Sequence, residues 1–169
     1  MRIFGIILLL VVSMGACKRT TGVQDSDFSE TPVTAAPAPS AADGDSLAYY
    51  YERTACFGQC PIFKLSIYAS GYAIYEGKNY VNNIGTYHSF IDVAALLKIN
   101  EAANSIGYFG LQSVYDDPNK LDVPSKITII RQGDQKISVT NRVKGPKSLE
   151  VLYSAFDDVI ATATWKPKS

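Results

Sequence analysis

Two cysteines four residues apart are the part of the chain best suited to chemistry. Cys56 and Cys60 have Gly58 between them and Pro61 after them. Such a pair has four possible states: a structural disulfide, a redox-active dithiol, part of a metal site, or an inert reduced pair. Arg53 is the only nearby cation, and Pro61 leads into a predicted strand, not into a helix whose N-terminus would favour a reactive thiolate. We expect a structural disulfide; the alternative is a thiol-disulfide redox or metal-binding activity centred on the pair.

Gly58 is expected to let the backbone turn tightly enough for the two β-carbons to approach. Other residues with chemical potential give weaker signals. The single histidine, His88, precedes Ser89 and Asp92, but neighbours at one strand end point in different directions, so no catalytic triad is expected. A zinc site would need ligands such as His88 and Asp122 beside the cysteines. We predict no catalytic residue, no metal ligand and no cofactor.

A third cysteine ends a predicted export signal. An apolar run over residues 3–12 follows a basic residue, and mostly small residues then lead to Cys17. The run is shorter than the ~20 residues of a membrane-spanning helix, and it fits a signal peptide over residues 1–16. This ending resembles the lipobox of bacterial lipoproteins, in which the cysteine carries fatty acyl chains such as palmitate. The resemblance implies lipidation of Cys17 and, with Lys18 following, an outer-membrane location facing the periplasm.

Length and charge restrict the possible classes of function. The chain has 169 residues, of which 47% are hydrophobic, and its 16 basic residues balance 16 acidic ones. This is enough for one domain and a tail, and the zero net charge argues against nucleic-acid binding, which needs a basic face. Residues 17–45 are rich in Thr, Ser, Ala and Pro, so we predict a lipidated cysteine followed by a disordered tether. A single domain is expected over residues 46–166.

The domain has the pattern of an α+β fold. Strands are expected where apolar and polar residues alternate, over residues 47–53, 61–69, 72–76, 80–89, 127–131 and 136–141. Apolar residues recur at helical spacing over 93–106, with Asp92 as N-cap, and over 146–163. We predict an antiparallel sheet, made of a three-stranded meander plus a hairpin, with the two amphipathic helices packed on one face.

The cysteine segment also resembles a known family. Cys-Phe-Gly-Gln-Cys-Pro over residues 56–61, a Ser-Gly turn at 70–71, Tyr-Glu-Gly at 75–77 and Asp-Val-Pro at 122–124 are similar to a bacterial domain family of unknown function. That family occurs in exported proteins and has a Cys-Phe-Gly-x-Cys-Pro core. The resemblance covers residues 46–165 and implies no activity. The positions that match its pattern are Arg53, Cys56, Gly58, Cys60, Pro61 and Asp122.

The sequence predicts where a ligand would bind only in outline. Tyrosine gives large contact area with a polar group, and several tyrosines could share one sheet face: Tyr49, Tyr51, Tyr68, Tyr75 and Tyr87. We single out Arg53, Tyr75 and Asp122 as candidate binding residues. The expected protein is a lipid-anchored cell-envelope protein, a non-enzymatic binding or structural module. Its expected partners are the membrane, through the anchor, and an envelope protein or small ligand.

Overall fold

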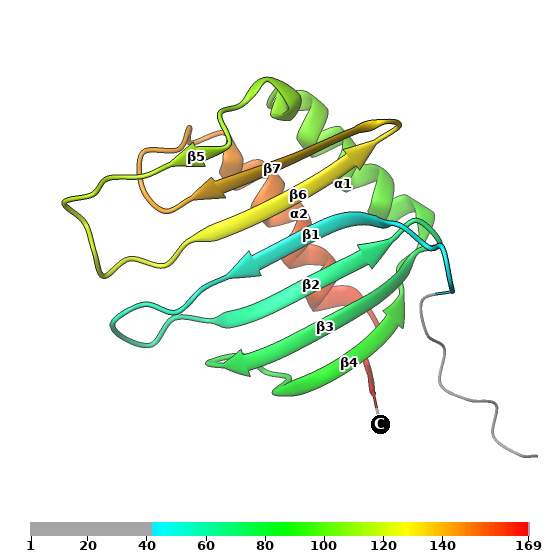
Figure 1. The fold of residues 1–169 in the computed structure, drawn as a ribbon. Helices are drawn as coiled ribbons and strands as arrows, with labels where there is room; N and C mark the ends of the chain where they lie inside the picture. The colour runs from blue at the N-terminus through cyan, green and yellow to red at the C-terminus, as the bar shows by residue number, and fades with distance from the viewer. Residues whose placement is uncertain (1–41, 169) are drawn as a thin grey trace, which may run out of the picture. The chain divides into compact units, whose positions relative to one another are not determined.

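A computed structural model describes residues 42–168, in which one β-sheet is backed by two helices (Figure 1). The strands are β1 (Leu47–Arg53), β2 (Ile62–Tyr68), β3 (Tyr72–Asn79), β4 (Gly85–Phe90), β5 (Val114–Tyr115), β6 (Lys126–Gln132), β7 (Gln135–Asn141) and β8 (Lys166–Pro167). The helices are α1 (Val93–Ser105), the short 3-10 helix η1 (Tyr108–Gly110) and α2 (Leu149–Thr162). The predicted signal peptide, Cys17 and nearly all of the predicted tether lie outside the described residues.

The α+β class is confirmed, but the predicted sheet is wrong. All eight strands form one sheet in the order β5-β7-β6-β1-β2-β3-β4-β8, and the β5–β7 pair is parallel. The meander and the hairpin are therefore not separate, because β1 pairs with both of them: Tyr51 lies opposite Leu65 of β2 and Thr128 of β6. The pairing of β1 with the distant β6 cannot be read from the local alternation of apolar and polar residues. Two-residue strands such as β5 and β8 are too short to show alternation at all.

The core lies between the helices and one face of the sheet, and Figure 1 shows both long helices behind the strands. Every three or four residues α2 buries an apolar side chain, at Leu149, Leu152, Tyr153, Phe156 and Val159. These meet the inward residues of the central strands. Tyr51, fully buried, has its ring centroid 5.7 Å from that of Tyr153 and 5.1 Å from that of Phe156. Aromatic packing thus holds α2 against β1.

Most of the predicted tyrosine face belongs to this core. Tyr49, Tyr51 and Tyr75 are buried on the helix side of the sheet, and Tyr87 lies directly opposite Tyr75 in the β3–β4 ladder. Tyr68 follows the inward-facing Ile67 of β2 and therefore points to the other face. Packing against the helices accounts for the tyrosines that share this face.

Local signals at α1 are confirmed. The Asp92 carboxylate accepts a hydrogen bond from the Ala95 N–H at 2.8 Å, as an N-cap does. Gly107 follows the helix with a φ of 63°, the left-handed conformation that commonly ends helices. Within residues 42–168, neither long helix has the length and hydropathy needed to cross a bilayer.

The described chain enters the domain at one end of the central strands, and the loops that carry the candidate site lie at the other end. At one end the described chain enters: Ser46 O accepts from the Ala69 N–H at 2.9 Å, and Asp45 accepts from Ser70 in the β2–β3 turn. At the other end lie the β1–β2 loop, the β3–β4 loop and the loop before β6, all on the left in Figure 1. The cysteines and the residues described next are at or near this second end.

Candidate functional site

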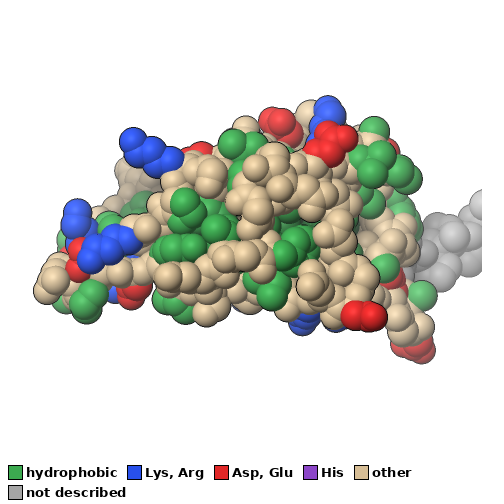
Figure 2. Space-filling model, turned by 90° about the horizontal axis from the view of Figure 1, so that it is seen from above, with side chains coloured by type: hydrophobic (Ala, Val, Ile, Leu, Met, Phe, Trp, Pro, Cys, Tyr) green, Lys and Arg blue, Asp and Glu red, His purple; other side chains and the backbone are tan. Residues whose placement is uncertain are grey.

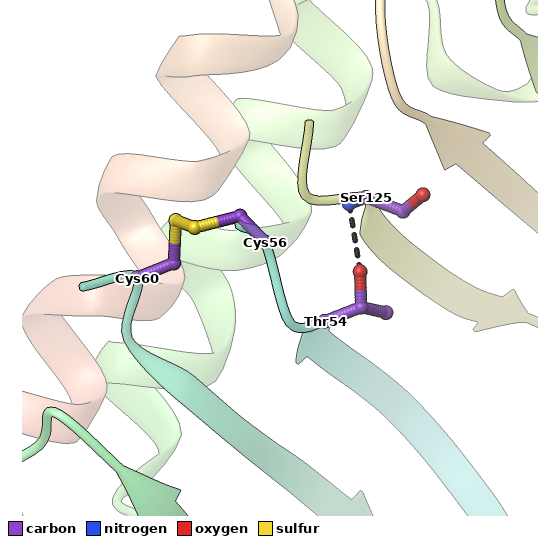
Figure 3. The surroundings of a disulfide bond; sticks show 4 residues. All are labelled: Thr54, Cys56, Cys60 and Ser125. Carbon is purple, nitrogen blue, oxygen red and sulfur yellow. Dashed lines mark hydrogen bonds between the residues drawn. A yellow bond between two sulfur atoms is a disulfide. The ribbon is translucent and has the colours of Figure 1, made fainter. Parts of the chain in front are cut away.

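The cysteine pair closes the loop between β1 and β2, as Figure 3 shows. The Cys56 and Cys60 sulfurs are joined in a disulfide, with the Cα atoms 5.9 Å apart, so the prediction of a pair at disulfide distance is confirmed. Beside it, the Ser125 N–H donates to Thr54 Oγ1 at 2.8 Å, and the Thr54 N–H donates to the Ser125 carbonyl at 3.0 Å. The disulfide and this pair of hydrogen bonds fix the β1–β2 loop against the start of β6.

The expected role of Gly58 is wrong. Its φ is not positive, and a β-carbon added there would meet only Cys56 Sγ, at an ordinary contact distance of 3.9 Å. The disulfide therefore closes without needing a glycine at this position. The exposed side chain next to it, Phe57, is 91% accessible at the tip of the loop.

Replacing both Cys56 and Cys60 by serine should lower the free energy of unfolding by about 2 kcal/mol. Closing a five-residue loop removes little entropy from the unfolded chain, which sets this modest size. Urea unfolding of the oxidised protein and of the double variant measures the difference. The reduced unaltered protein is the control and should match the double variant. Unfolding curves that coincide, together with a disulfide that glutathione readily reduces, would instead favour a redox role.

Arg53, at the end of β1, connects the sheet to α2. Its Nε donates to the Tyr51 hydroxyl at 2.6 Å, and its Nη2 lies 2.5 Å from Asp157 Oδ2. The guanidinium carbon is 5.5 Å from the centroid of the Tyr51 ring and 5.7 Å from that of Phe63. Burial raises the pKa of Tyr51, which keeps its hydroxyl neutral and able to accept this bond. The cation is thus held in place by two rings and a carboxylate.

Asp157, the partner of Arg53, lines a pocket of about 540 Å³ on the helix side of the sheet. Burial raises the pKa of Asp157, and the guanidinium of Arg53 opposes that rise. The lining residues come from β2, β3, the β3–β4 loop, α2 and the segment after α2: Phe63, Tyr75, Tyr80, Val81, Asn82, Asn83, Asp157, Ile160, Ala161, Ala163 and Trp165.

Three aromatic rings form the apolar side of this pocket. The Tyr75 ring centroid is 5.7 Å from that of Phe63 and 5.4 Å from that of Trp165. The Trp165 indole N–H donates to the Ile160 carbonyl at 2.9 Å, which fixes the ring to the end of α2. Burial raises the pKa of Tyr75, with a smaller contribution from neighbouring Tyr87, so its phenol stays uncharged. These contacts set the orientation of the three rings in the folded chain.

Another part of the lining is the β3–β4 loop, which folds back on Gly77. A β-carbon on Gly77 would lie 1.8 Å from the Asn83 carbonyl oxygen and 2.9 Å from Val81 Cγ2, so only glycine lets the loop approach so closely. In the same loop Tyr80 adopts a φ of 51°, a left-handed conformation that is uncommon for a bulky residue. Such backbone strain is concentrated at binding and catalytic sites. It leaves the Tyr80 side chain half exposed beside the pocket.

The structure brings together two of the three predicted binding residues. Tyr75 lines the pocket, and Arg53 forms an ion pair with Asp157, whose carboxylate is part of the lining. Asp122 is exposed in the loop before β6 and does not line it. Sequence reasoning missed the polar lining and the tryptophan: Asn82, Asn83, Asp157 and Trp165. Trp165 is the only tryptophan of the chain, which is the one sequence signal that could have identified it.

The acidic loop before β6 is closed by ion pairs. Arg142 Nε lies 2.5 Å from Asp116 Oδ1, and Lys144 Nζ lies 3.2 Å from Asp117 Oδ2. Figure 2, seen from above, shows Lys and Arg side chains next to acidic ones at the left end of the molecule. Over residues 42–168, no group of three or more His, Cys, Asp or Glu side chains is arranged to hold a metal ion.

The sequence profile of a domain of unknown function, DUF6438, matches residues 48–160, which is more than half of the chain. The matched segment runs from β1 into the last turns of α2. It includes Arg53, both cysteines and Asp157, whereas Trp165 lies beyond it. No curated protein matches the chain.

Proposed function

The chain belongs to the DUF6438 family of domains of unknown function, and from that premise we propose that it is a lipid-anchored cell-envelope protein whose domain binds a small ligand without transforming it. The observation that carries the proposal is the pocket beside α2. Its volume of about 540 Å³ falls in the range of small-molecule sites, roughly 300–1,000 Å³. Such sites combine an apolar surface with a few polar groups that orient the ligand, as the aromatic rings and the two asparagines do here.

The lining favours binding over catalysis. Its side chains are aromatic, aliphatic and amide groups with a single carboxylate, Asp157, and that carboxylate is already paired with Arg53. A nucleophile beside a general base, the usual arrangement for covalent catalysis, is not found among these lining residues. The disulfide lies at the β1–β2 loop and contributes no atom to the pocket lining, which supports a structural role for it.

The proposed membrane anchor is compatible with this site. The lipobox-like ending at Cys17 supports lipidation, and two or more acyl chains anchor a protein stably. The described chain enters the domain beside the β2–β3 turn, at the opposite end of the strands from the β3–β4 loop that walls the pocket.

Filling the pocket tests the proposal. Ala161 is exposed on α2 and lines the pocket, so the ring introduced by Ala161→Phe would occupy the ligand's space with little effect on the core. The matched control is Ala94→Phe, at an exposed position of α1 outside the pocket. The full chain is purified gently from its host envelope, and bound small molecules are detected by native mass spectrometry.

We expect a bound molecule in the unaltered chain and in Ala94→Phe, and at least a tenfold lower occupancy in Ala161→Phe. The added ring occupies volume that the ligand needs, and a steric clash of this kind cannot be relieved by rotation of the ligand alone. Equal occupancy in both variants, or no ligand in the unaltered chain, would contradict the proposal.

A further inference from the structure

Building on the proposed function, we infer that the pocket binds a neutral saccharide, with one sugar ring lying against the half-buried indole of Trp165. The inference rests on the lining chemistry of the pocket and on the balance of charge inside it. The saccharide inference depends on the proposed binding function. The experiment below therefore distinguishes failure of the saccharide inference from failure of the binding function.

The aromatic surface suits the flat face of a sugar. Phe63 and Tyr75 are buried, at 4% and 2% exposure, whereas Trp165 is only half-buried and packs on Tyr75 with a centroid distance of 5.4 Å, so Trp165 is the ring that can offer a face to a ligand. Ring faces carry the negative part of the aromatic quadrupole, and the axial C–H groups of a pyranose carry a small positive charge. The indole N–H of Trp165 is already bonded to the Ile160 carbonyl, so this ring offers its surface and not its polar edge.

The polar groups of the lining suit hydroxyls. Asn82 and Asn83 each bring an amide that both donates and accepts, as a hydroxyl does. Asp157 binds Arg53 through Oδ2, and its Oδ1 has no hydrogen-bond partner among residues 42–168. That oxygen is a free acceptor for a ligand hydroxyl. An apolar surface with amide and carboxylate groups around it matches a molecule with C–H faces and a ring of hydroxyls.

The lining of the pocket disfavours two competing ligand classes, ammonium groups and anions. An aromatic cage binds an ammonium group on the faces of several rings, but Phe63 and Tyr75 are buried here, and Arg53 already lies 2.5 Å from the only carboxylate of the lining. A phosphate or carboxylate ligand would need a cation, and no Lys or Arg lines the pocket. The charge balance therefore favours a neutral ligand, and the two amides and the free carboxylate oxygen favour one that carries hydroxyls.

Trp165 makes the test direct, because it is the only tryptophan of the chain and lines the pocket. Its fluorescence is followed in the detergent-solubilised full chain while probes are added. The saccharide probes are chitotriose and maltotriose, and the competing probes are tetramethylammonium chloride and inorganic phosphate. We expect a saturable change with at least one saccharide and none with the competing probes.

Asn82→Ala and Asn104→Ala supply the matched variants. Both asparagines are exposed, but only Asn82 lines the pocket. We expect Asn82→Ala to weaken saccharide binding about fivefold, the loss of one hydrogen bond, while Asn104→Ala leaves it unchanged. Equal affinity of the two variants, or no response to either saccharide, would overturn the inference. Response to tetramethylammonium or phosphate alone would overturn the saccharide class while leaving the proposed binding function standing.

Discussion

Replacing Gly77 by alanine is expected to lower the free energy of unfolding by about 3 kcal/mol and to abolish ligand binding. The added β-carbon would lie 1.8 Å from the Asn83 carbonyl oxygen, a backbone atom that cannot rotate away. Either β3 or the β3–β4 loop must therefore move, and overpacking of this kind typically costs about 1–3 kcal/mol, or more when backbone is involved. Because Tyr80, Asn82 and Asn83 of that loop line the pocket, the wall moves with it.

Urea unfolding and Trp165 fluorescence measure the two effects of Gly77→Ala separately. The control is Gly110→Ala: Gly110 has no positive φ, and a β-carbon there meets nothing within 4 Å. We expect the control to change stability by less than about 1 kcal/mol, the usual range for an unhindered Gly to Ala exchange. A Gly77→Ala protein with unaltered stability would show that the loop is not held by this close contact.

Sequence reasoning succeeded where the signal is local. Alternation predicted β2 and the beginning of β3, helical spacing predicted both long helices, and Asp92 caps α1 as its position indicated. These features depend on residues within a few positions of each other, which a periodic pattern captures. The disulfide was expected from two cysteines four residues apart in a chain predicted to be exported, and the two sulfurs are joined.

The rest depended on contacts between distant segments. β1 lies at the centre of the sheet because it pairs with β6, more than seventy residues later, and no pattern within β1 reveals that partner. A third meander strand was expected from residue 80, but β4 begins at Gly85, since residues 80–84 fold back over Gly77. The loop that replaces the start of this strand is the wall of the pocket. Local propensity was overridden where the candidate site is built.

Arg53 was predicted to bind a ligand directly, but in the structure it contacts Asp157, which lines the pocket. It was chosen as a candidate binding residue, yet its guanidinium is occupied by Tyr51, Phe63 and Asp157. Its effect on a ligand is indirect: it neutralises Asp157 and leaves only one of that carboxylate's oxygens free. The charge and the hydrogen-bonding capacity of the pocket thus depend on Arg53, although Arg53 itself does not line the pocket.

Replacing Cys17 by serine is expected to move the protein from the membrane to the soluble fraction. A serine hydroxyl cannot form the thioether to the lipid, and each methylene withdrawn from the bilayer removes ~0.8 kcal/mol of binding free energy. Loss of two or three acyl chains therefore removes essentially all membrane affinity. Because an uncut signal would itself hold the chain, the variant should carry a conventional cleavable signal in place of residues 1–16.

Fractionation and mass spectrometry of the N-terminal peptide measure the result. The matched control replaces Cys56 and Cys60 by serine and keeps Cys17; it should remain in the membrane with its acyl chains, since the disulfide acts only within the folded domain. The Cys17→Ser protein should bind saccharide as the unaltered chain does, because the pocket lies wholly within the described residues. Retention of the Cys17→Ser protein in washed membranes would show that the domain itself, and not the lipid, supplies the attachment, and would contradict the proposed anchor.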